Sequence, residues 1–371
     1  MDARAFLKLC LDKLAQDKGT DLYLKVDSPP HYRASNQLKP IPGVKPLLEG
    51  EMTELAQYIM KPHHQERLER ERSVDFSFAA DGHGRLRANL FYQQGELSCV
   101  IRMAWKEIPS FEELRIPEIM KKWALAERGL ILIAGAASSG KSTTANAMIN
   151  LINTNMEKHI ITIEDPIEFV HMEKRSLINQ REVGQDAPSF ASALYYATRQ
   201  APDVIFIGEI RDAETFSSAL AASEIGRLVI SSIHARSVAH VFERVLSFFP
   251  PDQKARVLVD ISYNVSVIAS QRLVSRANGK GYVPVFEILT MTAIVSDMIR
   301  QQKLDKLSQV MRGGAADGMQ SLNQALLKLK GDGLITELEM YRASDKPQEL
   351  AMSAKGIAFE KQDAKHIIGD Y

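Results

Sequence analysis

A chain of 371 residues is too long for one ordinary hydrophobic core, so its length predicts two domains. The residues are 45% hydrophobic and 25% charged, as in soluble globular proteins, and no apolar run approaches the ~18 residues needed to span a membrane. The formal net charge is zero, which argues against a protein that tracks along nucleic acid, because such proteins carry a basic excess that neutralises phosphates.

The N-terminus lacks the features of a secretion signal. Acidic residues interrupt its first apolar stretch and no small-residue cleavage site follows, so the pattern predicts an amphipathic helix. The two cysteines, Cys10 and Cys99, are not part of a C-x-x-C pair. This spacing argues against a zinc site or a disulfide framework and favours a reducing cytoplasm.

The first 105 residues are predicted to form a small α+β domain. Helical periodicity covers 5–15 and a charged stretch predicts a second helix over 51–72. A turn is expected at Asn36-Gln37. Alternation of apolar and polar residues predicts strands at 20–26, 31–33, 74–78, 85–91 and 97–103.

A polar segment at 106–115 is predicted to be a linker, and an α/β domain follows over 116–285. Apolar runs that lie between helical segments predict a parallel sheet with crossover helices. The predicted strands are 129–134, 159–163, 203–207 and 227–233. Residues 286–345 are expected to be mainly helical, and the weak periodicity of 346–371 predicts a mobile tail.

Residues 135–142 fit the phosphate-loop motif G-x-x-x-x-G-K-[ST]. An apolar strand precedes the motif and a helical segment follows it, so strand, loop and helix come in the order that the motif needs. A chance match on a small-residue turn is the alternative. The residues predicted to bind nucleotide here are Gly135, Ala136, Ser138, Ser139, Gly140, Lys141, Ser142 and Thr143.

The phosphate-loop residue types suit ATP and Mg²⁺. Glycines let backbone N–H groups turn toward phosphates, and the N-terminus of the following helix attracts negative charge. Lys141 is expected to reach the β- and γ-phosphates, and Ser142 is expected to ligate Mg²⁺.

Two later strands are predicted to end in acidic residues that face the same ligand, because ligands bind beyond the carboxyl ends of parallel strands. Glu164 is expected to polarise the attacking water or to hold Mg²⁺ through water, with a capping acid before Pro166 as the alternative. Glu209 follows a strand that resembles a Walker B strand and is expected on the Mg²⁺ side. Arg211 and Asp212 could equally form a structural ion pair.

A third strand ends at His234. If the sheet is ordered as expected, this histidine lies near the γ-phosphate and joins Glu164 and Glu209 as a catalytic candidate. The alternative is a packed or solvated residue, which is more common for a single histidine at a strand end.

These motifs resemble the type II/IV secretion ATPase superfamily, and within it the type IV pilus retraction ATPases of the PilT/PilU family. Residues 199–212 match the signature R-x-x-P-D-x-x-x-x-G-E-x-R-D, and 163–169 match the family's Asp box. His234 stands at the second histidine of the His box. The segments 180–184 and 318–320 are also similar to the family.

The resemblance implies a RecA-like ATPase core, a PAS-like N-terminal domain and a hexamer with ATP bound between the two domains. It also implies that Arg87 and Arg102 help to neutralise phosphate charge, a role that suits the planar multi-donor guanidinium. Two exposed strand arginines are the alternative. Assembly ATPases of the superfamily are longer and carry a four-cysteine zinc site, which this chain lacks.

Several departures from the family pattern argue against an independent retraction motor, and the Arg-Gln-Ala-Pro-Asp run at 199–203 and the Asp-x-Ile-Arg remnant at 297–300 are more similar to the PilU-type accessory paralogue. Ser138 replaces a glycine, Ala136 stands where proline is common, and Arg227 replaces the first histidine of the His box. The C-terminal A-I-R-N-L-I-R-E element keeps only Ile-Arg near its end, at Ile299-Arg300.

The sequence therefore predicts a hexameric motor for pilus retraction at the cytoplasmic face of the inner membrane. Its expected partners are an active paralogous ATPase and a membrane platform protein, with no nucleic acid. A catalytically weak nucleotide-binding coupler of an active paralogue is the first alternative, and a nucleic-acid translocase built on the same core is the second.

Overall fold

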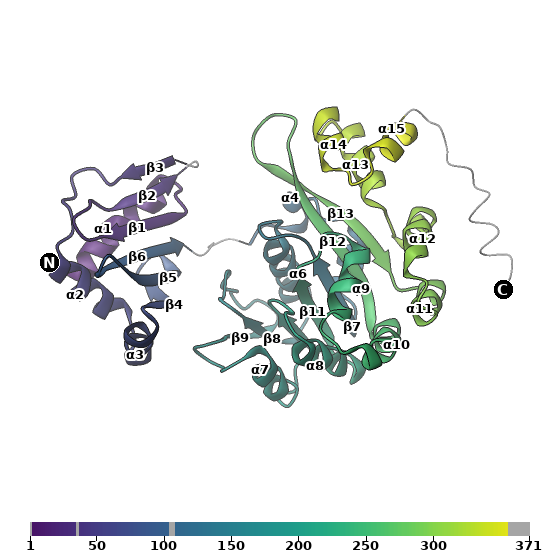
Figure 1. Ribbon diagram of the computed structural model, residues 1–371, viewed down its shortest axis with the longest axis horizontal. Coiled ribbons are helices and arrows are strands. Elements are labelled where there is room, and N and C mark those ends of the chain that lie inside the picture. Colours follow the sequence, from purple (N-terminus) through teal and green to yellow (C-terminus); the bar gives the residue numbers. More distant parts are fainter. Residues whose placement is uncertain (1, 35–36, 104–107, 355–371) are drawn as a thin grey trace. The chain divides into compact units, whose positions relative to one another are not determined.

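The computed structural model describes residues 2–34, 37–103 and 108–354. Asn36 of the predicted turn, residues 106–107 of the predicted linker and residues 355–371 of the predicted tail lie outside these ranges. The chain forms two compact units, one built mainly from the residues before 104 and one built mainly from the residues after 107 (Figure 1). Within the described ranges, no helix is both long and apolar enough to cross a membrane.

The first unit is an antiparallel sheet of six strands in the order β3-β2-β1-β6-β5-β4. Three helices pack with it, and alternating strand residues fill a single core. The strands are β1 (Asp21–Lys25), β2 (His31–Ala34), β3 (Gln37–Pro40), β4 (Ser73–Ala80), β5 (Gly84–Gln93) and β6 (Glu96–Met103). The helices are α1 (Ala3–Gln16), α2 (Glu49–Ile59) and α3 (Pro62–Glu71).

The prediction of one helix over 51–72 is wrong, because α2 ends at Ile59 and α3 begins at Pro62. Lys61 is extended, with φ −86° and ψ 161°. A proline ring excludes the preceding residue from the helical region, while proline itself fits the first position of a helix. One proline thus ends the first helix and begins the second.

The second unit contains a seven-stranded sheet in the order β13-β12-β7-β11-β10-β8-β9, parallel except for the antiparallel β12–β13 pair. The sequence patterns predicted four of these strands and did not indicate β9, β12 or β13. The strands are β7 (Gly129–Ala134), β8 (His159–Glu164), β9 (Leu177–Glu182), β10 (Val204–Ile207), β11 (Leu228–Ile233), β12 (Val265–Ser275) and β13 (Tyr282–Thr290).

Helices cover both faces of this sheet (Figure 1). Their bounds are α4 (Phe111–Leu114), α5 (Glu118–Ala124), α6 (Lys141–Asn155), α7 (Phe190–Ala197), α8 (Ala213–Glu224), α9 (Val238–Leu246), α10 (Lys254–Asn264), α11 (Ala293–Arg300), α12 (Leu307–Gly313), α13 (Leu322–Gly331), α14 (Glu337–Ala343) and α15 (Pro347–Ala354).

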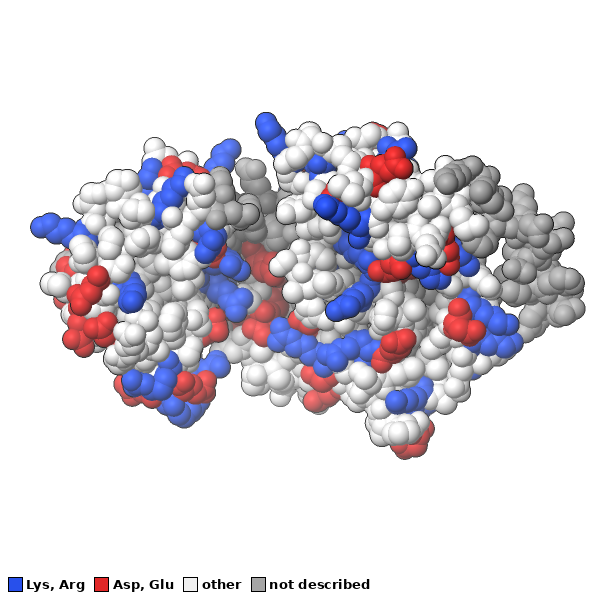
Figure 2. Space-filling model, turned by 45° about the horizontal axis from the view of Figure 1, so that its top comes forward, with Lys and Arg blue, Asp and Glu red and all other residues white. Residues whose placement is uncertain are grey.

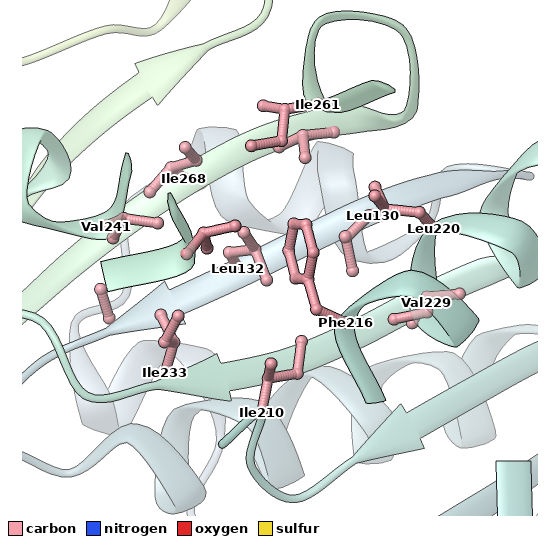
Figure 3. Close-up of a cluster of buried hydrophobic side chains, with 14 of the residues drawn as sticks. Leu130, Leu132, Ile210, Phe216, Leu220, Val229, Ile233, Val241, Ile261 and Ile268 are labelled. Carbon is pink, nitrogen blue, oxygen red and sulfur yellow. The ribbon is translucent and has the colours of Figure 1, made fainter. Parts of the chain in front are cut away.

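Strand β7 contributes side chains to the hydrophobic cores on both faces of the sheet, because successive side chains of a strand point to opposite faces. Leu130 and Leu132 lie against Phe216 of α8, as Figure 3 shows, whereas Ile131 and Ile133 belong to the core beneath α6. A strand that is buried on both faces must be apolar throughout, which explains the continuous apolar run that made β7 predictable.

The described chain ends in helices that pack against the far ends of β12 and β13. Val274, Val283 and Val285 form a separate core there with α13, α14 and α15 (Figure 1). The predicted fold class is confirmed: an α/β core with a mostly parallel sheet follows an α+β unit and precedes C-terminal helices. The exact domain boundaries stay predictions.

Candidate nucleotide-binding site

The phosphate loop connects β7 to α6 through residues 135–140, and its two glycines are required by space and conformation. A Cβ at Gly135 would lie 2.3 Å from Ser139 Oγ and 2.7 Å from the carbonyl oxygen of Gln271. Gly140 has φ 86°, in the left-handed region that favours glycine, and a Cβ there would lie 2.8 Å from Gln271 Nε2. Side chains at either position would distort the loop.

Ser138 adopts φ 60°, a left-handed conformation that costs a non-glycine residue about 1 kcal/mol. This is the position where the resembling family usually has glycine. The backbone at residue 138 therefore has a conformation that suits glycine, and Ser138 is modestly strained in it.

Lys141 folds back over the loop that precedes it. Its Nζ donates to the carbonyl oxygens of Gly135 at 3.0 Å and Ala136 at 2.8 Å, and the residue is buried. The ammonium group is thereby held inside the curve of the loop. Because α6 begins at this same residue, its N-terminal positive pole adds to the charge of Lys141.

The loop contains features that suit a bound phosphate group. Ser139 Oγ is buried and has no hydrogen-bond partner among the described residues. Together with the two glycines, which leave space where side chains would stand, this hydroxyl fits the oxygens of a nucleotide phosphate. Ser142 and Thr143 follow in the half-buried first turn of α6.

Gln271 of β12 supports the phosphate loop and was missed in the sequence. It is buried, and its Oε1 accepts a hydrogen bond of 2.8 Å from Thr144 Oγ1 of α6. Its backbone oxygen and Nε2 are the atoms that limit space at Gly135 and Gly140. The sequence of β12 mixes apolar and polar residues, so no pattern along that strand marked Gln271.

The acids predicted at strand ends lie at one edge of the sheet, because β8, β10 and β11 are parallel neighbours. Glu209 contacts His234, with 3.1 Å between Glu209 Oε1 and His234 Nε2. Its other oxygen accepts from Arg211 Nε at 3.0 Å, and Arg211 Nη1 reaches Asp165 Oδ2 at 3.2 Å. Glu209 is therefore part of a charged network.

Arg211 does not pair with Asp212. Asp212 instead caps α8, where its carboxylate accepts from the backbone N–H of Thr215 at 2.8 Å. The suggested Arg211–Asp212 ion pair is wrong, because the residue at a helix N-cap turns its side chain toward the first helical turn.

His234 lies in the field of the phosphate loop. Burial lowers its pKa, the positive charge of Lys141 lowers it further, and Glu209 acts in the opposite direction. A histidine with a lowered pKa is neutral at pH 7, and its Nε2–H tautomer can donate to Glu209. The charge of Lys141 thus reaches His234, and the position of His234 near the γ-phosphate stays a prediction.

Glu164 lies in a different environment from Glu209. It is buried at the end of β8, and its Oε1 accepts from Thr162 Oγ1 at 2.7 Å and from Gln180 Nε2 at 3.2 Å. Both donors are uncharged. Gln180 belongs to the family-like segment 180–184, and its sequence pattern indicates no individual role for it.

Arg87 and Arg102 stand directly opposite each other on β5 and β6 of the first unit. Arg102 Nε donates to Asp21 Oδ1 at 2.7 Å, and Asp21 is buried. Arg87 makes a longer contact of 3.4 Å with Asp75 Oδ1. Both guanidinium groups are exposed, so each can meet a further anion, and their role toward nucleotide stays a prediction.

A cavity of about 630 Å³ lies elsewhere in the second unit, between α9, β13 and the C-terminal helices. Its lining includes Glu287, whose pKa is raised by burial although the N–H of Val238 donates to it at 2.7 Å. The fully described phosphate loop contributes nothing to this lining. The loop is the better candidate for nucleotide because lysine, helix pole and strand-end acids converge there.

Known proteins with similar sequences include pilus ATPases. Residues 102–365 match the Type II/IV secretion system protein family. The chain is 36% identical to the type IV pilus ATPase PilU of Pseudomonas aeruginosa, over 99% of this chain and 94% of PilU. It is 37% identical to the type IV pilus retraction ATPase PilT of the same organism, over 87% of this chain and 93% of PilT.

A solved structure has the same architecture. The crystal structure of the pilus retraction motor PilT with bound ADP is 38% identical and has a TM-score of 0.86, over 92% of this chain and 97% of that chain. The predicted family resemblance is confirmed by these similarities.

Proposed function

Because the chain belongs to the Type II/IV secretion system protein family, and to its pilus retraction ATPases, we propose that it is an ATP-hydrolysing motor for type IV pilus retraction. The observation that carries this proposal is the phosphate loop, in which Lys141 is held over the loop carbonyls beside the strand-end acids. Full-length similarity to PilU favours a PilU-type accessory motor.

ATP would bind with its phosphates against the loop of residues 135–140 and the N-terminus of α6. Lys141 would exchange its contacts with the loop carbonyls for contacts with the β- and γ-phosphates. Ser142 and Glu209 would hold Mg²⁺, directly or through water, and bound Mg²⁺ would offset the negative charge that develops on the phosphates.

Glu164 is proposed to orient and deprotonate the attacking water. The carboxylate of Glu164 lies at the end of β8, beside the strand end that carries Glu209, and Thr162 and Gln180 donate to its Oε1, which positions it for that role. Glu209 contacts Arg211 and His234. These contacts suit a residue that binds Mg²⁺ and links the metal to the charged side chains around it.

Arg87 and Arg102 are proposed to reach the phosphates in a hexamer whose ATP lies between domains. Arg87→Ala is the better test, because it breaks only an exposed contact with Asp75, whereas Arg102→Ala leaves the buried Asp21 unpaired. We expect Arg87→Ala to lower ATP hydrolysis about 10-fold or more with unchanged folding. Arg67→Ala, which removes an exposed arginine of α3, is the control.

The proposed setting is a homo-hexamer at the cytoplasmic face of the inner membrane, alone or with an active paralogous ATPase, acting on a membrane platform protein. Closure of the two domains on ATP would turn hydrolysis into distortion of the ring. Light scattering of the full-length protein with and without a non-hydrolysable ATP analogue tests the assembly, and a particle that stays monomeric in both would contradict it.

The first test of the function is Mg²⁺-dependent ATP hydrolysis by the purified full-length protein, with Lys141→Ala and Glu209→Ala beside it. We expect turnover that both substitutions abolish. Nucleotide binding without turnover, alone and with a paralogue, would instead favour the coupler, a candidate supported by the strained Ser138 in the loop.

A nucleic-acid translocase has less support. The net charge is zero, and Figure 2 shows Lys and Arg interspersed with Asp and Glu over the face that it displays. Tight nonspecific binding of DNA would require a basic surface and would weaken steeply with salt. DNA binding that falls steeply between low and moderate salt would overturn the prediction that the chain binds no nucleic acid.

A further inference from the structure

Gln180 of β9 contacts the candidate base Glu164 and belongs to a chain of hydrogen bonds that leads to α6, the helix that follows the phosphate loop. We propose that Gln180 is a positioning residue, whose side-chain amide fixes the carboxylate of Glu164 relative to α6. The inference rests on the proposed role of Glu164 in hydrolysis.

The register of β8 and β9 places the interacting side chains on one face of the sheet. Thr162 is the partner of Gln180 in this parallel pair, and Glu164 lies two residues after Thr162. Residues two apart on a strand share a face, so all three side chains converge. Thr162 Oγ1 and Gln180 Nε2 both donate to Glu164 Oε1, at 2.7 Å and 3.2 Å.

The orientation of the Gln180 amide is determined by its second contact. Gln180 Oε1 accepts from the backbone N–H of His171 at 2.8 Å. A backbone N–H can only donate, so the oxygen must face His171 and the NH₂ group must face Glu164. Glutamine is thus the residue type that serves both neighbours, and an isosteric glutamate would serve only His171.

His171 is in turn anchored to α6. Its Nε2 lies 2.7 Å from Asn146 Oδ1, and Asn146 Nδ2 donates to the carbonyl oxygen of Ser142 at 2.9 Å. Burial lowers the pKa of His171 to about 4, so the ring is neutral at pH 7 and Nε2 carries the proton that Asn146 accepts. The chain of contacts therefore runs from Glu164 to the first turn of α6.

This path gives Gln180 a function beyond strand pairing. Ser142 is the proposed Mg²⁺ ligand, so the contacts set the distance between the base and the metal side of the site. A displacement of a catalytic group by about 1 Å can lower turnover by about 100-fold. Loss of the Gln180 amide should therefore reduce catalysis more than it reduces nucleotide affinity.

Three variants separate positioning from strand stability. Gln180→Ala removes the contacts with Glu164 and with His171, and Gln180→Glu keeps the acceptor for His171 but replaces the donor to Glu164 by an oxygen. Asn179→Ala is the matched control, because the neighbouring amide binds His159 Nε2 at 2.8 Å instead of Glu164. Kinetic constants, affinity for a non-hydrolysable ATP analogue and melting temperature are measured for each full-length variant.

We expect Gln180→Ala to lower kcat roughly 10-fold or more, with nucleotide affinity within about 2-fold of wild type. In Gln180→Glu, a second carboxylate beside Glu164 favours its protonated form, so the acidic limb of the kcat profile should move to higher pH. Glu182 is buried and is the register partner of Glu164, so its carboxylate also lies nearby. Because Glu182 is unchanged in every variant, a shift of the pH profile is caused by the substitution at residue 180.

Glu164→Gln in the same assay shows whether a negative result contradicts the role of Glu164 or only the role of Gln180. Wild-type turnover in Glu164→Gln would overturn the assignment of Glu164 as the base and the Gln180 inference with it. Loss of turnover in Glu164→Gln, with both Gln180 variants matching Asn179→Ala in kcat and pH profile, would overturn the role of Gln180 alone.

Discussion

The ends of β8 and β10 carry glutamates in two opposite environments. Glu164 is buried and bound by the neutral side chains of Thr162 and Gln180, whereas Glu209 contacts Arg211 and His234. The two strands are parallel neighbours, so the difference comes from what surrounds each strand end and not from the strands themselves.

Each glutamate also belongs to a network with its own histidine. The Glu164 network passes through His171, which is deeply buried, and the Glu209 network passes through His234, which is half-exposed and close to Lys141. The contacts of Thr162, Gln180 and His171 hold geometry through uncharged groups, whereas the contact of Glu209 with Arg211 joins two charges and responds when metal or phosphate arrives. This contrast supports separate roles for two residues of the same type.

Lys141→Ala should have the largest effect, because both networks are proposed to act on phosphates that this lysine is proposed to bind. We expect kcat/KM for ATP to fall roughly 10⁴-fold, since binding and stabilisation of the transferred phosphate are both lost. Lys174→Ala is the control, because that lysine also binds oxygen atoms along α6, on Asn150 and Thr154, away from the loop. Equal activity of the two variants would contradict the site.

Glu164→Gln and Glu209→Gln test the contrast directly. We expect Glu164→Gln to lower kcat roughly 10³-fold with unchanged nucleotide affinity, because only the base is lost. Glu209→Gln should instead raise the Mg²⁺ concentration needed for half-maximal activity. Titration of ATP hydrolysis with Mg²⁺ distinguishes the two variants. Identical Mg²⁺ dependence in both would contradict the separate roles proposed for Glu164 and Glu209.

His171 should make the stability of the second unit depend on pH. Its pKa is lowered from 6.5 to about 4 by burial, so the folded state favours the neutral ring. The resulting stability is present above pH 6.5 and is lost as the pH falls toward 4, with a total of about 3 kcal/mol.

Denaturant unfolding between pH 7 and pH 4 measures this contribution. His171→Gln keeps a donor for Asn146 without a titrating ring, and we expect it to flatten the pH dependence of the unfolding free energy. His234→Gln serves as the control in the charged network, where the half-exposed ring should contribute less. A slope that persists in His171→Gln would show that other groups cause it.

Ser138→Gly should produce the smallest change. Glycine relieves the left-handed strain at φ 60°, but it also adds freedom to the unfolded chain, so we expect a stabilisation below about 1 kcal/mol. Ser138→Ala keeps the strain and is the control. A large rise in ATP hydrolysis in Ser138→Gly, measured in the same assay, would show that this serine limits the motor.

Local signals explain which elements were predictable. The strands β7, β8, β10 and β11 are almost entirely buried because the sheet is covered on both faces, and each contains a run of apolar residues. Edge strand β9 has mostly half-buried and exposed residues, and β12 contains polar residues that its neighbours need. Their sequences contain no comparable apolar run, because these segments form strands by pairing with strands that are distant in the chain.

The candidate site was predictable to the same degree. The phosphate loop and the strand-end residues Glu164, Glu209 and His234 follow from motifs, because each motif needs particular residue types at fixed spacing. Gln180 and Gln271 were missed as site residues. Their contacts with Glu164 and Thr144 bridge separate strands and helices, and no spacing along one element reports them.

Short-range patterns along the chain are enough to specify the α/β class, the phosphate loop and the family. The difference between the two glutamates depends instead on the packing of distant segments. Glu164 ends β8 and Glu209 follows β10, and their environments come from β9, from α6 and from the residues after β10 and β11. A side chain's neighbours are set by how strands pair and helices pack, so chemistry that depends on neighbours is decided at that level.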